Sequence, residues 1–136
     1  LNLGQKDFSW NQKEDQQQKI ISKKQQELYA KINAHVIEHK LFLDPYLSLE
    51  TLANSLQLSS GYLSFLINNY SSNNFSDYIN ELRINQVKQI ISDPEYLHYT
   101  IVSIGLESGF NSKSTFYKSF KKFTGMSPAE FKKQMA

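Results

Sequence analysis

The sequence contains one pattern twice, and this internal repeat limits the fold more than any other feature. Leu52 and Ala53 recur 52 positions later as Ile104 and Gly105. Each small residue lies in a short amphipathic segment that a tight turn joins to a longer one, which is the plan of a helix-turn-helix unit. A single copy is a weak signal because such turns are common, whereas two copies in register are a strong one. The first part of the repeat aligns Leu49, Leu52, Ala53 and Leu58 with Ile101, Ile104, Gly105 and Phe110; the second part, at an offset of 53, aligns Leu63, Ile67, Tyr70 and Tyr78 with Phe116, Phe120, Phe123 and Phe131.

The remaining segments are also helical in pattern, so the sequence predicts an all-α fold of about seven helices. Residues 25–40 carry apolar side chains at a period near four, and no segment alternates in the way of a half-buried strand. Residues 127–130, SPAE, have the capping serine, first-turn proline and third-position glutamate that begin a helix. The inner face expected of the helix 25–40 consists of Leu28, Ile32, Val36 and His39.

The predicted helix 75–91 has two apolar stripes, although a helix that covers one core needs only one. We therefore expect this helix to contact both halves of the repeat and to fix their separation. At about 1.5 Å per residue it is roughly 25 Å long. Two helices held in this way suit successive major-groove segments, which lie about 34 Å apart on one face of DNA. The first stripe contains Phe75, Tyr78, Ile79, Leu82 and Ile90, and the second contains Ile84, Val87 and Ile91.

These patterns divide the chain into four parts. Residues 1–24 are polar and rich in glutamine, and we expect them to be a linker or the tail of a missing upstream domain. Residues 25–74 form the first helix-turn-helix subdomain, residues 75–92 the linker helix and residues 93–136 the second subdomain. Since the first residue is not methionine, we expect the chain to be a piece of a longer protein.

Charge is distributed unevenly along the chain. The formal net charge is +2, yet residues 100–136 hold six lysines against two glutamates. Residues 41–99 hold two basic side chains against six acidic ones. A basic surface concentrated near the C-terminus is suited to a polyanionic partner.

Other classes of protein find no support in the sequence. Without cysteine, the chain has no disulfide framework and no thiolate metal site. No apolar run is long enough to span a bilayer, and no signal peptide is visible. His35 and His39 have a spacing that can bind a metal, but no third ligand lies nearby in sequence. With no nucleophile–base pair, glycine-rich phosphate loop or paired carboxylates, we expect no enzyme activity, no cofactor and no metal site.

Two long stretches resemble one known family. Residues 101–131, IVSIGLESGFNSKSTFYKSFKKFTGMSPAEF, resemble the signature of AraC/XylS-family transcription regulators. Residues 47–84, LSLETLANSLQLSSGYLSFLINNYSSNNFSDYINELRI, are similar to the family's first helix-turn-helix unit and linker helix. The resemblance covers about residues 25–133. It departs at Gly105, where alanine is usual, and we expect a cost under about 1 kcal/mol in helix propensity, with close packing still allowed.

The resemblance implies a function. It implies the C-terminal, sequence-specific double-stranded DNA-binding domain of a bacterial, cytoplasmic transcription regulator, which is not an enzyme. It also implies an upstream sensing domain of the same protein, absent from this chain, and RNA polymerase as a further partner. No membrane contact is expected of this segment.

In the second unit, the resemblance places base contacts on one strip of the helix that begins near Lys113. Lysine can donate to guanine O6 and N7, serine and threonine can serve either base type, and threonine methyl or tyrosine ring carbons can contact thymine methyls. Lys121 and Lys122 are better placed for phosphates, which position a protein without specifying sequence. We expect Phe116, Phe120 and Phe123 to face the core instead. The predicted base-contacting residues are Lys113, Ser114, Thr115, Tyr117 and Lys118.

In the first unit, the corresponding strip has a different chemistry. There is no lysine or arginine from residue 59 to residue 74, and Phe65 stands where the family often has a basic residue. We therefore expect apolar contact with thymine methyls and a hydrogen bond from Asn68 or Ser64, rather than bidentate contact with guanine. The predicted base-contacting residues are Gly61, Tyr62, Ser64, Phe65 and Asn68.

Other phosphate contacts are expected from capping residues near helix starts, where backbone N–H groups are available. These residues are Ser48, Ser60 and Thr100. Arg83 has two open interpretations, which are a phosphate contact and an intramolecular ion pair. The candidate partners of such a pair are Asp77, Glu81 and Asp93.

Two alternatives remain open for the surface as a whole. The basic face of the C-terminal region can be an ordinary solvated face of a core helix. The chain can also be a helical protein–protein interaction module that docks through Tyr62, Phe65 and the basic C-terminal surface.

Overall fold

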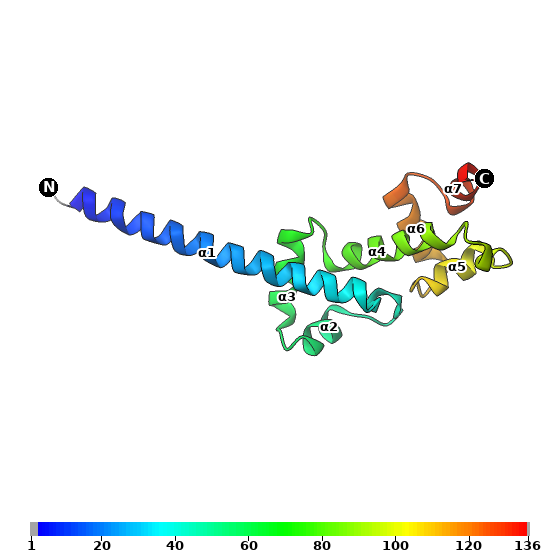
Figure 1. The fold of residues 1–136 in the computed structure, drawn as a ribbon, viewed down its shortest axis with the longest axis horizontal. Coiled ribbons are helices and arrows are strands. Elements are labelled where there is room, and N and C mark those ends of the chain that lie inside the picture. The colour runs from blue at the N-terminus through cyan, green and yellow to red at the C-terminus, as the bar shows by residue number, and fades with distance from the viewer. Residues whose placement is uncertain (1–2, 136) are drawn as a thin grey trace.

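One long helix, α1 (Leu3–Glu38), leads into two groups of short helices that meet along a central helix, α4 (Phe75–Ile90). The computed structural model describes residues 3–135, with side chains from Trp10 onward. Over this range the fold is all helical with seven α-helices, as the sequence predicts. Figure 1 shows α2 and α3 near the end of α1, and α5 to α7 around the far part of α4. The other elements are η1 (Leu41–Leu43), α2 (Leu49–Ser55), α3 (Ser60–Tyr70), η2 (Pro94–Tyr96), α5 (Ile101–Glu107), α6 (Lys113–Thr124) and α7 (Pro128–Met135).

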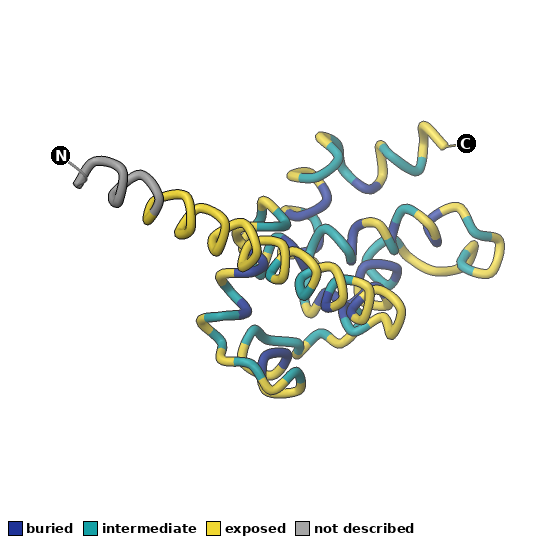
Figure 2. The backbone as a smooth tube through the Cα atoms, turned by 60° about the vertical axis from the view of Figure 1, so that its left-hand side comes forward, coloured by how far each residue is buried: buried dark blue, intermediate teal, exposed yellow. Residues whose placement is uncertain are grey.

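The first helix begins much earlier than the predicted residue 25. Residues 11–25 are mostly glutamine, lysine and glutamate, which favour helix, and neither proline nor glycine occurs between residues 5 and 44. Every side chain from Trp10 to Lys24 is exposed, so this part of α1 projects away from the rest of the chain (Figure 2). The assignment of residues 1–24 as a linker stays a prediction.

The C-terminal half of α1 buries a narrower face than the sequence predicts. Ile32 and Val36 are buried and Leu28 is partly buried, as expected. His39 is exposed, so its place in the inner stripe was wrong. The reason is that α1 ends at Glu38 and Lys40 adopts a left-handed conformation with φ 50°, which turns the chain away.

Helix α4 contributes to two separate cores, which confirms its two apolar stripes. Tyr78 and Ile79 are buried in a first cluster with residues of α1, η1, α2 and α3. Ile84 and Val87 are buried in a second cluster with residues of α5 and α6. Ile90 belongs to this second cluster, so its assignment to the first stripe was wrong. The first cluster reaches along α4 only as far as Leu82, and the buried apolar side chains of the following turns belong to the second cluster.

The two halves share hydrogen bonds as well as apolar positions, which confirms the repeat. In the first turn, the Leu58 N–H donates to the Ala53 carbonyl at 2.9 Å, and in the second the Phe110 N–H donates to the Gly105 carbonyl at 3.2 Å. At the ends of α3 and α6, the Ser71 and Thr124 hydroxyls donate back to a carbonyl four residues earlier. The same local bonding therefore builds both units from different side chains.

Arg83 joins the two subdomains through its buried guanidinium group, so both sequence interpretations of Arg83 were wrong. Its Nε donates to the Phe42 carbonyl at 2.7 Å, and a terminal nitrogen donates to the Asp44 carbonyl at 2.9 Å. The same group lies 5.8 Å from the centroid of the Phe110 ring. Burial lowers the pKa of Arg83, partly offset by Asp44. The backbone of Gly109 (φ 105°) lies so close to Phe42 and Arg83 that a Cβ there would collide with both.

We predict that Arg83→Met lowers the free energy of unfolding by about 1–3 kcal/mol, because the buried Phe42 carbonyl loses its donor. Urea denaturation followed by circular dichroism measures this. The matched control is Lys88→Met in the last turn of the same helix, which should cost less than about 1 kcal/mol. Equal stability of the two variants would contradict the assigned role of Arg83.

We also predict that Gly105→Ala is destabilising, although alanine is the better helix former. A Cβ at Gly105 would lie 2.6 Å from Cγ of Phe116, whose ring is buried in the second core. Displacing that ring should cost about 1–3 kcal/mol, more than the gain of about 1 kcal/mol in helix propensity. The control is Gly61→Ala, since a Cβ there meets nothing within 4 Å. Thermal unfolding should rank Gly61→Ala above the original chain and Gly105→Ala below it, and the reverse order would refute this packing argument.

Candidate nucleic-acid interface

Helix α6 is fixed to the second core by its phenylalanines and begins at a defined cap. The Ser112 hydroxyl accepts a hydrogen bond from the Thr115 N–H at 3.2 Å, and Gly125 ends the helix with φ 78°. Phe116 and Phe120 are buried, and Phe123 is partly buried against the same core. The opposite face of α6 is therefore presented to solvent in one orientation.

The residues predicted for base contact lie on this outer face, with one exception. Lys113, Ser114, Thr115 and Lys118 are all exposed. Tyr117 is only partly exposed because its ring packs edge-on against Phe116, with ring centroids 5.4 Å apart. The Lys113 ammonium lies 5.3 Å from the centre of the Tyr117 ring, so a cation–π contact orients this side chain. Tyr117 thus stands at the boundary between the core and the outer strip.

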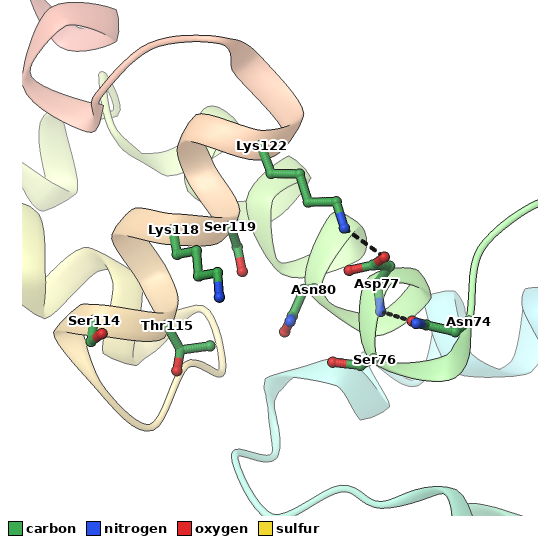
Figure 3. A pocket seen from close by; sticks show the side chains of 9 residues that line it. All are labelled: Asn74, Ser76, Asp77, Asn80, Ser114, Thr115, Lys118, Ser119 and Lys122. Carbon is green, nitrogen blue, oxygen red and sulfur yellow. Dashed lines mark hydrogen bonds and ion pairs between the residues drawn. The ribbon is translucent and has the colours of Figure 1, made fainter.

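A groove separates the outer strip of α6 from the beginning of α4 (Figure 3). Its volume is about 440 Å³. In Figure 3 the Lys118 side chain extends from α6 into the groove, opposite Asn80 of α4. The groove is lined by Asn74, which caps α4, by Ser76, Asp77 and Asn80 of α4, and by Ser114, Thr115, Lys118, Ser119 and Lys122 of α6.

The α4 side of this groove was missed by sequence reasoning. Ser76 and Asn80 lie one helical turn apart, a spacing that marks a polar face. This signal was present, but α4 has more than one polar face, and only the packing of α6 decides which one borders the groove. Ser119 was also missed; it is buried where α6 meets α4.

Lys122 forms an ion pair across the groove that the sequence did not suggest. Its Nζ lies 2.7 Å from Oδ2 of Asp77, which is the one salt bridge between described side chains. Lys122 is 56% exposed and Asp77 27% exposed. The predicted phosphate contact of Lys122 stays a prediction, as does that of the exposed Lys121.

In the first unit, the predicted residues of α3 form a surface with an aromatic centre. Phe65 is 42% exposed, and its ring stacks on that of Tyr62 with a centroid separation of 6.3 Å and an interplanar angle of 9°. Gly61 and Asn68 are exposed, and the Asn68 amide donates to the Ser64 hydroxyl at 3.2 Å. The structure therefore brings all five residues onto one side of α3.

The capping residues are placed as expected in two cases out of three. Ser48 and Thr100 cap α2 and α5, and each hydroxyl accepts from a backbone N–H three residues later. Ser60 is not a cap, because the hydroxyl of Ser59 accepts from the Tyr62 N–H and Ser60 is the first helical residue. Contact of these residues with phosphate remains a prediction.

The described residues show no cluster of metal-binding side chains. His35 and His39 pack edge to face with ring centroids 4.6 Å apart, and no described group of three or more side chains is arranged to hold a metal. Burial raises the pKa of Tyr78, whose hydroxyl donates to Asn33 at 2.7 Å. The pKa of Tyr29 is also raised, mainly by burial and to a smaller extent by the nearby negative charge of Glu81. Within the described part of the chain, no helix has the length and apolar character to cross a membrane.

Two helix-turn-helix units that share α4 as a common support define the class of this chain. The family model described as "Helix-turn-helix domain" matches residues 52–134. The chain belongs to the AraC-type helix-turn-helix family of DNA-binding transcription regulators, which confirms the family resemblance.

Individual relatives agree with this assignment. The chain is 32% identical over 90 residues to the melibiose operon regulatory protein of Escherichia coli, covering 66% of this chain and 29% of that protein. It therefore spans less than a third of that relative's length. A solved AraC-type DNA-binding domain-containing regulator from Chromobacterium violaceum has a TM-score of 0.58 at 30% identity, covering 66% of this chain and 78% of the other. The AdpA DNA-binding domain, solved with a target DNA, has a TM-score of 0.66 at 19% identity over 78% of this chain and 90% of that one, a likeness in fold alone.

Proposed function

We propose that this chain binds double-stranded DNA sequence-specifically, with α3 and α6 entering successive segments of the major groove. The observation that supports this most strongly is that α4 is buried in both cores, so one rigid helix holds the two units together. At about 1.5 Å per residue, its 16 residues extend roughly 24 Å. A support of this length is suited to two recognition helices that enter major-groove segments one turn of DNA apart, about 34 Å.

The two units would contribute differently to recognition. On α6, Lys113 and Lys118 would donate to guanine, Ser114 and Thr115 would bond to either base type, and Tyr117 would contact a thymine methyl. On α3, the stacked Tyr62 and Phe65 rings would contact thymine methyls, because no basic side chain is present from residue 59 to residue 74. Both units would contribute to base discrimination, and the basic unit would supply most of the electrostatic affinity.

The wider setting of the chain follows from its family and is part of the proposal. The regulator would act in the bacterial cytoplasm without enzyme activity and would contact RNA polymerase. A sensing domain elsewhere in the same protein would control residues 25–136, with residues 1–24 as the connection. The curated relative that regulates the melibiose operon is itself much longer than this chain, which supports a multidomain protein.

A second candidate function rests on one observation, the stack of the exposed Phe65 on the partly exposed Tyr62. An exposed aromatic pair of this kind is also suited to docking against another protein. In that case α6 alone would bind DNA, and α3 would contact a protein partner.

We predict that selection of bound sequences from a random duplex pool yields two conserved boxes with centres about one helical turn apart. The box contacted by α3 should be rich in A·T pairs, because its residues suit thymine methyls. Recovery of a single box would show that α3 serves protein docking instead. Recovery of no enriched sequence would contradict sequence-specific binding.

We predict that Lys118→Ala and Lys121→Ala weaken DNA binding in different ways. Lys118→Ala removes a base contact, so it should cost affinity for the selected duplex by about 1–3 kcal/mol and relax the preference at one position. Lys121→Ala removes a phosphate contact, so it should weaken selected and random duplexes alike and reduce the log–log salt slope by about 0.9. Fluorescence anisotropy over a salt series measures both. Identical effects of the two variants on both duplexes would refute this division of roles.

A further inference from the structure

We propose that Asp77 is a specificity-determining residue that withholds Lys122 from DNA phosphates and so limits binding to non-specific DNA. This inference rests on the proposed function and gives a role to a residue that touches no base. The Asp77 carboxylate lies 2.7 Å from the Lys122 ammonium, across the groove between α4 and α6. A lysine held by a carboxylate has to break that pair before it can neutralise a phosphate. In place of the sequence-based prediction, we therefore expect Lys122 of the original chain to make no phosphate contact.

The position of Asp77 favours this pair. Asp77 lies in the first turn of α4, where the Asn74 side chain accepts from its N–H at 2.8 Å. The positive end of the helix dipole attracts a negative charge, so a carboxylate in this turn is favourably placed. In Figure 3 the Lys122 side chain crosses to α4, whereas Lys118 extends into the groove.

Neighbouring charges make the pair more than a surface contact. Lys118 precedes Lys122 by one turn and Lys121 is adjacent, so three lysines repel one another on this part of α6. Asp77 is the one acidic side chain that lines the groove. Removing its charge would leave Lys122 unpaired beside two other lysines, and a nearby phosphate would then be its best partner.

The effect should fall mainly on non-specific complexes. In helix-turn-helix proteins the N-terminal residues of the recognition helix contact the bases. Lys122 lies nine residues beyond Lys113, about 14 Å further along α6. When α6 is docked specifically, Lys122 is therefore kept away from the base edges in the DNA major groove. Sequence-independent binding depends almost entirely on phosphate contacts and tolerates many orientations, so one additional lysine raises it most.

The test measures binding of the 136-residue chain to a selected and a random duplex by fluorescence anisotropy between 50 and 200 mM salt. Asp77→Asn should steepen the log–log salt slope on random duplex by about 0.9, the value for one additional phosphate contact. The gain in random-duplex affinity over the original chain should therefore grow about 3.5-fold from 200 to 50 mM salt. Affinity for the selected duplex should change less, so the specificity ratio falls.

Matched variants separate the pair from a general charge effect. Lys122→Met alone should leave the slope unchanged, and Asp77→Asn combined with Lys122→Met should return it to the original value. The control Glu95→Gln removes one negative charge from the exposed η2 turn, outside the groove, and should not change the slope. Circular dichroism melting curves confirm that each variant is folded.

Two outcomes would overturn the inference while leaving the proposed function intact. If Lys122→Met alone reduces the slope by about 0.9, Lys122 already binds phosphate despite Asp77. If Asp77→Asn leaves the slope unchanged, the pair only stabilises the fold. Failure of the original chain to prefer the selected duplex would instead refute sequence-specific binding itself, and the role of Asp77 with it.

Discussion

The arrangement of the two units depends on the buried guanidinium of Arg83. This group donates to two carbonyls of the segment that follows α1 and lies against the Phe110 ring of the second core. Because a guanidinium presents several donors in a fixed plane, it fixes orientation as well as distance. The glycine at position 109 completes the junction by letting the backbones of the two subdomains approach. The relative orientation of the exposed faces of α3 and α6 therefore depends on the contacts of Arg83.

The two cores could be predicted from sequence because apolar periodicity reports which faces of a helix are buried. The stripes on α4 and the repeated turns follow from that rule and from local capping chemistry. Periodicity does not show where along α4 the first core ends. Ile90 was therefore assigned to the first core although it is buried in the second. Arg83 was misjudged for a related reason, since charge suggests partners of opposite sign. Its partners are instead two backbone carbonyls and the side-chain amide oxygen of Asn80.

The candidate interface was predictable for α6 but not for the surface opposite it. The exposed side of α6 follows from helical geometry once the phenylalanines are assigned to the core, and the family resemblance implies which of its residues contact bases. The pairing of Asp77 with Lys122 joins residues 45 positions apart and depends on the angle between two helices. Side-chain pairs of this kind leave no periodic trace in a sequence. They also decide which lysines of a basic surface are available to a polyanion.

The repeated hydrogen bonds at the turns have a consequence for how such proteins change over time. Both units close their first turn through the carbonyl of a small residue, alanine in one and glycine in the other. Both end their longer helix through a hydroxyl, serine in one and threonine in the other. None of these groups belongs to the exposed strips of α3 or α6. A lineage can therefore replace one strip and acquire a new target sequence while the architecture and the second strip are inherited unaltered.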